Sequence, residues 1–344
     1  MKFIHTADIH LDSPLIGVAD GKTRRFELVK AVANLADYAD NNGVEVVVVA
    51  GDLFDDKFVA DQTIRSVADI ISNCKARWLV LKGNHGDATP YNKLHEICNT
   101  VSFFGDNWTT YRLGNVVFCG KELDKNDNSP WTLPLADNDY NVVVLHGDVD
   151  SDEYGHIDGK ALAAAPVKYV ALGHRHSLQK VMFGRNTGMY SGTLEARGFD
   201  ENEPTGFVVV DTDKNEVRFV PQAIRSVITK DIDLSKADSD VAVQRIVTDA
   251  VAEVAARNYL NVILRGNVAG GIRAKFVAEQ YLKDKFFALR IQDDTKPVRD
   301  LAKIAEEVSL KGEFVKLAMG IADEAERNRV LDMGLAALDG EDLQ

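Results

Sequence analysis

Cysteine is scarce in this sequence, which argues against a fold held together by disulfide bonds. The three cysteines, Cys74, Cys98 and Cys119, are odd in number, far apart and without a C-x-x-C spacing, so we expect three reduced thiols. Long hydrophobic runs are also lacking: the run at Val46–Ala50 has only five residues, whereas a membrane-spanning helix needs about 20. The opening segment, Met1–Asp8, lacks the long apolar stretch of a secretory signal peptide. We therefore expect a cytoplasmic protein.

Positive charge is the second scarcity. The chain has 40 Lys and Arg against 53 Asp and Glu, for a net charge of −13, whereas a protein that binds DNA unaided usually presents a basic surface. The best cluster of basic residues, Lys22–Arg25, is more simply explained as the solvated start of a helix. If the substrate carries phosphate, metal ions or a partner subunit would have to supply positive charge.

What is present is an ordinary globular balance, with 45% hydrophobic and 27% charged residues in 344, enough for one large domain and smaller modules. Residues 1–225 alternate between β-branched runs such as Glu45–Ala50 and helical patterns such as Arg24–Asn41, and then become mostly strands. This order predicts an α/β (α+β) fold in which a two-sheet β-sandwich is flanked by helices.

The composition changes near Pro221, which predicts further modules. Residues 226–292 have the pattern of a small α+β domain, with a long amphipathic helix over Ser239–Arg257. Residues 293–344 begin with a linker, Asp293–Arg299, and continue as a helical tail. The apolar stripe of that tail must be covered, either by this chain or by a partner.

Five short polar motifs follow expected strands, and they contain five of the eight histidines. Each motif alone is weak, because a single D-x-H or Gly-Asp is commonly structural. Their occurrence together, at strand ends and beside turn-forming glycines, predicts a functional site. The motifs are Asp8-Ile9-His10, Gly51-Asp52-Leu53-Phe54-Asp55, Gly83-Asn84-His85, His146-Gly147 and Gly173-His174-Arg175-His176.

These motifs supply seven candidate metal ligands. Three oxygen donors with four imidazoles suit Mn²⁺, Fe²⁺ or Zn²⁺ better than Ca²⁺, which prefers oxygen alone. Seven donors are too many for one ion but sufficient for two ions that share a carboxylate. The remaining histidines, His5, His95 and His156, are expected to be structural. The seven candidates are Asp8, His10, Asp52, Asn84, His146, His174 and His176.

The order of the motifs resembles that of the calcineurin-like metallophosphoesterase superfamily: D-x-H, G-D-x-x-D, G-N-H-[DE], a histidine, then G-H-x-H. The resemblance covers residues 1 to about 200, and Gly86 departs from it where an acidic residue is usual. The opening Phe3–Asp12 and the closing Met333–Leu338 are most similar to bacterial DNA double-strand-break repair exonucleases of the SbcD and YhaO type.

The resemblance implies a role for each candidate ligand. Asp8, His10 and His176 would hold one ion, and Asn84, His146 and His174 the other, with Asp52 bridging both. A hydroxide shared by the two ions would attack phosphorus. His85, with Asn84, would bind the substrate and act as the general acid for the leaving 3′ oxygen. Asp55 stands where some relatives have a second histidine.

The resemblance also implies partners. It predicts a metal-dependent DNA exonuclease or endonuclease that uses two divalent ions, foremost Mn²⁺, with Fe²⁺ or Zn²⁺ as alternatives. The small α+β module would cap the site and bind DNA, and the C-terminal helices would dock an SbcC-like coiled-coil ATPase subunit. Homodimerisation through the helices expected at Ala60–Cys74 and Tyr91–Cys98 is predicted by the same analogy.

Two other functions remain open at the level of the sequence. One is a phosphodiesterase or phosphatase of the same fold that acts on small nucleotides or phosphoproteins. Residues 226–344 argue against it, because enzymes of small substrates seldom need a cap and a tail. The other is a non-catalytic scaffold of the same fold. The complete ligand set and His85 argue against that one.

Overall fold

The structure is a computed structural model that describes residues 1–15, 20–55, 59–85, 88–123, 131–149 and 155–339. Contacts within the chain group these residues into two units. The first unit is Met1–Thr229 with Ala255–Asn261 and Phe286–Ala288, and the second contains the remainder. Each unit is described by itself.

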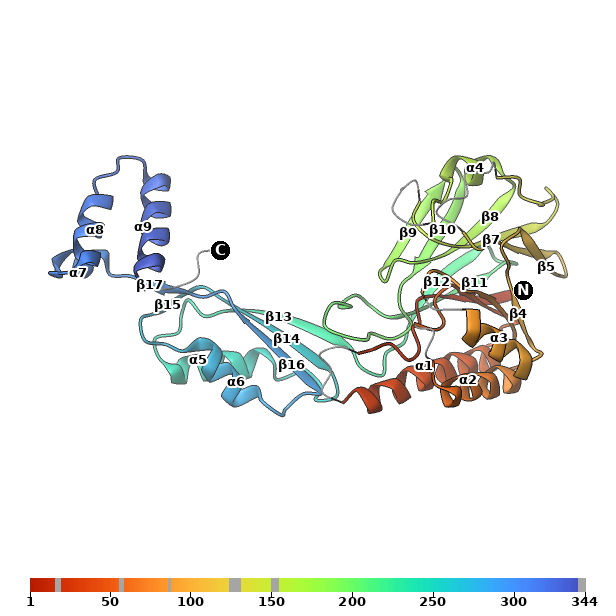
Figure 1. Cartoon of the computed structure of the whole chain (residues 1–344), viewed down its shortest axis with the longest axis horizontal. Helices are drawn as coiled ribbons and strands as arrows, with labels where there is room; N and C mark the ends of the chain where they lie inside the picture. Colours follow the sequence, from red (N-terminus) through yellow and green to blue (C-terminus); the bar gives the residue numbers. More distant parts are fainter. Residues whose placement is uncertain (16–19, 56–58, 86–87, 124–130, 150–154, 340–344) are drawn as a thin grey trace. The chain divides into compact units, whose positions relative to one another are not determined.

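Two six-stranded mixed sheets form the frame of the first unit (Figure 1). The first sheet has the order β12-β11-β1-β2-β3-β4, in which β1 to β4 run parallel and β11 and β12 are antiparallel additions. Its strands are β1 (Lys2–Thr6), β2 (Val46–Ala50), β3 (Arg77–Leu81), β4 (Val101–Phe103), β11 (Gly206–Asp211) and β12 (Glu216–Pro221).

The second sheet has the order β5-β6-β7-β8-β10-β9. Its four central strands are parallel, and the two edge strands pair antiparallel with their neighbours. Its strands are β5 (Thr109–Leu113), β6 (Val116–Gly120), β7 (Tyr140–His146), β8 (Val167–Gly173), β9 (Leu178–Phe183) and β10 (Asn186–Ser191).

Alternation along β2 shows how the layers are built. Val46 and Val48 belong to the core between the two sheets, whereas Val47 and Val49 belong to the core under the helices. Successive side chains of a strand point to opposite faces, so a strand buried on both faces must be apolar at every position. The run Val46–Ala50 meets that requirement, and all five residues are fully buried.

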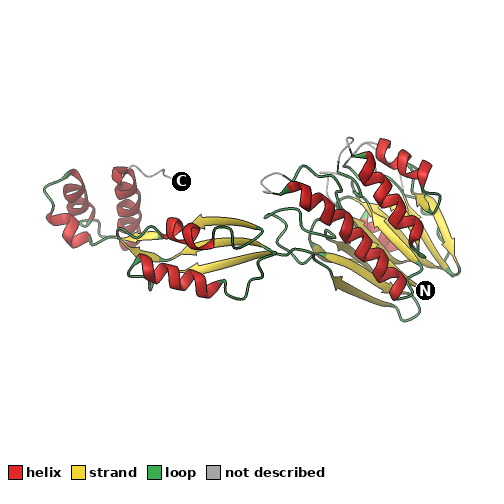
Figure 2. Cartoon of the chain, turned by 90° about the horizontal axis from the view of Figure 1, so that it is seen from below, coloured by secondary structure: helices red, strands yellow, loops and turns green. Residues whose placement is uncertain are grey.

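Three helices cover the outer face of the first sheet (Figure 2). They are α1 (Gly21–Asn41), α2 (Asp61–Asn73) and α3 (Ala88–Ile97). Helix α1 begins where the Asp20 side chain accepts a hydrogen bond from the Thr23 amide at 3.0 Å. The outer face of the second sheet carries α4 (Gly159–Ala164) and the aromatic pair Trp108 and Trp131. The predicted sandwich flanked by helices is confirmed.

The second unit contains smaller elements. It holds helices α5 (Asp240–Ala250) and α6 (Ala274–Leu282) and most residues of a three-stranded sheet. The strands of this sheet are β13 (Val227–Asp233), β14 (Tyr259–Arg265) and β16 (Ala288–Asp293), of which residues 227–229, 259–261 and 288 are counted in the first unit. Strands β15 (Asn267–Ala269) and β17 (Lys296–Val298) pair in parallel. The C-terminal helices, which share a small apolar core, are α7 (Leu301–Glu306), α8 (Leu310–Ala318) and α9 (Glu324–Asp339).

Two expectations from the sequence need correction. Helix α5 ends at Ala250 rather than Arg257, because the chain must turn back so that the Tyr259 amide can bond the Ser226 carbonyl at 3.0 Å. The segment Asp293–Arg299, expected to be a linker, contains β17. The predicted division into residues 1–225, 226–292 and 293–344 stays a prediction. Within the described residues no helix has the length and apolar content that crossing a bilayer requires.

Candidate metal centre

All seven predicted ligands lie where strands of the two sheets end, and the fold brings them together. Asp8 and His10 follow β1, Asp52 follows β2, and Asn84 follows β3 in the first sheet. The other three come from the second sheet: His146 is the last residue of β7, and His174 and His176 follow β8. The candidate centre therefore lies between two sheets, and neither sheet holds the complete set.

The backbone around these ligands is unusual. Asp8, His10, Asp52 and His174 have positive φ angles of 51°, 50°, 54° and 101°, a region that residues with a side chain rarely adopt. Such conformations cost about 1–3 kcal/mol each and persist where the surrounding structure enforces them. Hydrogen bonds between the loop after β1 and the loop after β2 hold these conformations. The Asp8 amide donates to the Gly51 carbonyl at 3.1 Å, and the His10 amide donates to the Asp52 carbonyl at 2.9 Å.

Two glycines make room for His146. A Cβ atom on Gly51 would lie 2.0 Å from His146 Nδ1, and a Cβ on Gly173 would lie 1.9 Å from the Ala50 carbonyl oxygen. Gly51 also has φ of +101°. Only glycine permits this approach of backbone to imidazole, which explains the glycines in these two motifs.

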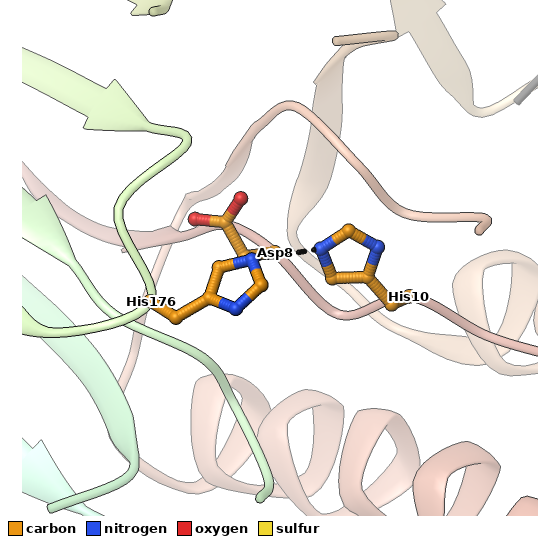
Figure 3. A group of neighbouring side chains, drawn as sticks. All are labelled: Asp8, His10 and His176. Atoms are coloured by element: carbon orange, nitrogen blue, oxygen red, sulfur yellow. Dashed lines mark hydrogen bonds between the residues drawn. The ribbon is translucent and has the colours of Figure 1, made fainter. Parts of the chain in front are cut away.

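The first group of ligands consists of Asp8, His10 and His176 (Figure 3). Each offers one ligand atom, and these atoms lie within 4.8 Å of one another. His10 Nε2 lies 3.2 Å from His176 Nε2, so the two imidazoles point their Nε2 atoms at the same place. These are three of the four residues that the resemblance implies for one ion.

The second group surrounds His146. Its Nε2 lies 2.6 Å from Asn84 Oδ1, which is itself 3.3 Å from His174 Nδ1. Asp52 lies between the two groups: its Oδ2 is 3.3 Å from His146 Nε2 and 3.8 Å from His10 Nε2. That position suits a bridging carboxylate. The two groups of ligands overlap, because the carboxylate of Asp8 also lies near Asp52 and His146.

This mixed oxygen and imidazole donor set fits two divalent ions of the Mn²⁺, Fe²⁺ or Zn²⁺ kind. One further contact agrees with ligand function: His146 Nδ1 lies 2.9 Å from the Ala50 carbonyl oxygen, which leaves Nε2 for an ion. The assignment of individual ligands to individual ions stays a prediction.

Asp52 and His146 are electrostatically coupled. Burial opposes ionisation of Asp52, but the contact with His146 outweighs it and lowers the Asp52 pKa to about 2. Burial also opposes protonation of His146, yet Asp52 raises the His146 pKa to about 9. The pair is therefore an ion pair at neutral pH, and a cation that binds here takes the place of the imidazole proton.

Other ligands are already in the protonation state that metal binding needs. Burial lowers the pKa of His10, although Asp55 partly opposes it. Burial, with repulsion from His146, lowers the pKa of His174. Neutral imidazoles are the form that binds metal ions.

His85 lies at the edge of the centre, and its side chain is 50% exposed. Its backbone amide donates to Asp52 Oδ1 at 2.9 Å, and its ring packs edge-on against that of His10 with centroids 4.9 Å apart. His85 Nδ1 is 3.7 Å from Asp55 Oδ1. His10, Asp55 and His85 form another group that could hold a metal ion, although exposure of His85 leaves it free to meet a substrate.

A half-buried carboxylate supports the turn that carries Asn84 and His85. Glu122, next to β6, accepts hydrogen bonds from the backbone amides of Lys82 and Gly83, the second at 3.2 Å. Burial raises the pKa of Glu122, with these two amides opposing the rise. No motif in the sequence marks this residue. Gly86, the departure from the family pattern, lies outside the described residues.

Three further carboxylates, which the sequence analysis did not assign to the site, contact the ring nitrogens of the ligand histidines that face away from the centre. Asp55 Oδ1 lies 2.7 Å from His10 Nδ1, Glu201 Oε1 lies 2.9 Å from His176 Nδ1, and Asp148 Oδ2 lies 3.5 Å from His174 Nε2. Asp55 stands in a motif that was singled out, but Asp148 and Glu201 follow no pattern that sequence alone would mark. The three histidines expected to be structural include His5, which is buried and contacts the Tyr169 hydroxyl at 2.9 Å.

Comparison with known proteins supports the family suggested by this geometry. The chain is 24% identical to the uncharacterized metallophosphoesterase YhaO of Bacillus subtilis over 279 residues, which are 74% of this chain and 68% of YhaO. It is 27% identical over 228 residues to the DNA double-strand break repair protein Mre11 of Methanosarcina acetivorans, covering 61% of this chain but only 36% of that protein.

Among solved structures, an archaeal phosphodiesterase matches with a TM-score of 0.41 and 16% identity, over 64% of this chain and 100% of that one. A sequence model of the calcineurin-like phosphoesterases matches residues 1–178. These residues contain the D-x-H, G-D-x-x-D, G-N-H and G-H-x-H motifs and all seven predicted ligands. The chain belongs to the calcineurin-like phosphoesterase family, whose members use dinuclear metal sites.

Proposed function

We propose that this chain is a metal-dependent DNA phosphodiesterase, an exonuclease or endonuclease of DNA repair. The observation that carries the proposal is the convergence of seven donors from two sheets around Asp52, with half-exposed His85 at the open edge. A dinuclear centre with an accessible acid beside it suits hydrolysis of a phosphodiester without a protein nucleophile. Similarity to DNA double-strand break repair proteins named Mre11 supports DNA as the substrate.

The residues of the chain have distinct tasks in this proposal. Two divalent ions, foremost Mn²⁺, supply Lewis-acid activation of water and neutralise charge on the phosphate when bound. Asp8, His10, Asp52, Asn84, His146, His174 and His176 hold them.

His85 contacts the scissile phosphate and gives a proton to the leaving 3′ oxygen, a step worth about 10²–10⁴ in rate. Its backbone amide is bound to Asp52, which keeps the imidazole beside the centre.

The first test is incubation of the purified chain with end-labelled linear DNA in Mn²⁺, beside an EDTA control and the His85→Ala variant. A small chromogenic phosphodiester runs in parallel. We expect metal-dependent loss of DNA with the intact chain and a 10²-fold or greater decrease with His85→Ala, about the value of general acid catalysis. Because His85 is not a metal ligand in this proposal, the variant should bind Mn²⁺ as tightly as the unaltered chain.

The outcomes separate the parts of the proposal. Cleavage of the chromogenic diester alone would favour a phosphodiesterase of small nucleotides, and the acidic net charge of −13 is the observation that makes this alternative worth testing. Absence of both activities together with tight Mn²⁺ binding would favour the scaffold. If His85→Ala loses Mn²⁺ binding and activity to the same extent, the proposed role of His85 as general acid is wrong.

The C-terminal helices are our proposed docking site for a coiled-coil ATPase subunit. Their shared core is small, and apolar side chains stay exposed around it, including Leu310, Leu317 and Met333. The test is co-elution of an SbcC-like ATPase subunit with the full chain and with a chain that ends before Pro297. Undiminished binding to the shortened chain would contradict this placement.

A homodimer through α2 and α3 is proposed by analogy, and Ile97 of α3 has 46% of its surface exposed in support of it. Light scattering of the purified chain measures the mass in solution. An Ile97→Glu variant should dissociate such a dimer, whereas an unchanged dimer would place the contact elsewhere.

A further inference from the structure

Two arginines lie behind the candidate metal centre, one next to each group of ligands. We propose that Arg197 and Arg175 are positioning residues: each holds carboxylates that orient the ligand histidines of one ion, Arg197 for His10 and His176, and Arg175 for His174. The inference rests on the ion-binding part of the proposed function and is independent of the identity of the substrate.

Arg197 holds two carboxylates at once. Its side chain is 18% exposed, and it binds Glu201 Oε1 through Nε at 3.0 Å and Nη2 at 2.5 Å. Nη1 of the same guanidinium lies 3.4 Å from Asp55 Oδ1. The planar fork of arginine suits this double task, because its donors point in fixed directions.

Each of these carboxylates contacts the Nδ1 atom of a predicted ligand. Glu201 lies 2.9 Å from His176 Nδ1, and Asp55 lies 2.7 Å from His10 Nδ1. When such an imidazole binds an ion through Nε2, its proton is on Nδ1, and a carboxylate at this distance is placed to accept that proton. The two Nε2 atoms converge to 3.2 Å. One guanidinium therefore orients two ligands of the same ion.

Arg197 also approaches His176 directly, with Nη2 3.2 Å from Nδ1. Arginine can only donate hydrogen bonds. Once His176 binds an ion through Nε2, its Nδ1 carries a proton and needs an acceptor, and Glu201 Oε1 lies 2.9 Å away. Arg197 then acts by fixing Glu201 rather than by bonding the imidazole.

Arg175 has the corresponding place beside the second group. Its Nε binds Asp148 Oδ1 at 2.7 Å, and Asp148 Oδ2 lies 3.5 Å from His174 Nε2. The guanidinium is steadied by Gln179 at 2.9 Å and by the ring of Tyr190 at 5.2 Å. This carboxylate faces Nε2, so Nδ1 of His174 is the atom turned to Asn84 and the centre. His174 therefore binds through the opposite nitrogen from His10 and His176.

The test is Mn²⁺ binding by the full chain. Titration calorimetry measures the affinity, and the electron spin resonance signal of a coupled Mn²⁺ pair shows whether both ions are bound. The variants are Arg197→Ala, Arg175→Ala and the double variant, with Arg112→Ala as the matched control. Arg112 binds Asp139 through two contacts of 2.7 Å on the far strand β5. Loss of groups that orient ligands typically costs about 10–100-fold in metal affinity.

We expect each single arginine variant to keep one ion and to bind the other about 10–100-fold more weakly. The coupled signal should disappear at low Mn²⁺ and return at high Mn²⁺, a rescue that a merely misfolded chain would not show. The double variant should weaken both ions, and Arg112→Ala neither. Arg197→Lys should recover only part of the affinity, because an ammonium cannot hold both carboxylates in one plane.

Several results would overturn the inference. If the unaltered chain binds two ions and the folded arginine variants bind both as tightly, the positioning role is wrong while the proposed function stands. If the double variant still keeps one ion at full affinity, the assignment of one arginine to each ion is wrong. If Arg197→Ala does not fold, Glu201→Gln and Arg197→Lys test the same contacts. Failure of the unaltered chain to bind Mn²⁺ would instead contradict the proposed function.

Discussion

Glycines behind the metal centre show how single residues control it. Gly51 lies against His146 with φ of +101°, and any side chain there would meet the imidazole. Gly43, between α1 and β2, also has positive φ, of +66°, but nothing lies within 4 Å of a Cβ built on it. Comparing alanine substitutions at Gly43 and Gly51 therefore separates two effects on stability. Both variants place a side chain at positive φ, but only the one at Gly51 brings a Cβ atom against His146.

Gly51→Ala should therefore reduce both stability and Mn²⁺ affinity, because its Cβ would lie 2.0 Å from His146 Nδ1. Gly43→Ala should cost only about 1–2 kcal/mol, the price of a left-handed conformation with a side chain. Denaturant unfolding and Mn²⁺ titration measure the two effects. Equal Mn²⁺ affinity in both variants would show that His146 can move without consequence.

His5 is a buried histidine outside the centre. It lies in the core between the sheets, contacts the Tyr169 hydroxyl at 2.9 Å, and has no exposed surface. Burial lowers its pKa from 6.5 to about 3, and a backbone contact with Leu172 only partly opposes this. In the unfolded chain the imidazole would take up a proton near its ordinary pKa.

His5 should make folding sensitive to acid. Its folded pKa is below its unfolded pKa, so its full contribution is present above about pH 6.5 and is lost progressively as the pH falls toward 3. Between pH 7.5 and pH 5 the loss is about 2 kcal/mol. His5→Gln should remove this part of the pH dependence, as measured by urea unfolding, whereas His95→Gln, at an exposed position of α3, should leave it in place. Parallel pH profiles of His5→Gln and the unaltered chain would refute this.

At the scale of elements, α1 is fixed by a buried cluster of charges. Arg24 has no exposed surface and donates to Glu27 Oε2 at 3.0 Å and to Glu195 Oε1 at 2.7 Å. Glu195 in turn accepts from the backbone amides of Ile224 and Arg225. The start of α1 is thus bound to two segments that are distant in sequence.

Arg24→Ala should destabilise the fold by about 3–5 kcal/mol, because it leaves the buried Glu195 carboxylate without its cation, whereas Glu27 keeps its ion pair with Arg225. The control is Arg112→Ala, whose ion pair with Asp139 is on the surface, so its loss should change the stability far less. Chemical unfolding of the two variants gives the comparison. A loss for Arg24→Ala no larger than that of the control would mean that the cluster relaxes or takes up water.

At the scale of the whole molecule, the candidate metal centre takes its residues from both sheets. Asp8, Asp52 and Asn84 come from the first sheet, and His146, His174 and His176 from the second. Ions held between them would link the two halves of the sandwich, and a ligand that binds only the folded state stabilises it by mass action.

Mn²⁺ at about 100 times its dissociation constant should add about 2.7 kcal/mol of stability, which is about 5–10 °C in melting temperature for a domain of this size. Scanning calorimetry with Mn²⁺ and with EDTA measures the shift. Asp52→Asn should lose most of it, because the bridging charge is gone. A shift of the same size in Asp52→Asn would mean that the ions bind elsewhere.

The sequence by itself determined the sandwich, and it predicted the donors of the candidate centre. Hydrophobic period distinguishes a doubly buried strand such as Val46–Ala50 from an amphipathic helix such as α1. The seven candidate ligands could be read from the polar motifs at strand ends, because residues that directly follow a strand are recognisable from the local sequence.

The tertiary structure alone decided what stands behind the ligands and how the donors are aimed. Asp148, Arg197, Glu201 and Glu122 lie in loops that share no motif, so their role depends on distance in space and not on spacing in the chain. The end of α5 at Ala250 was likewise set by a contact that brings Tyr259 to Ser226. Local pattern fixes which groups a chain carries, whereas packing fixes which of them meet.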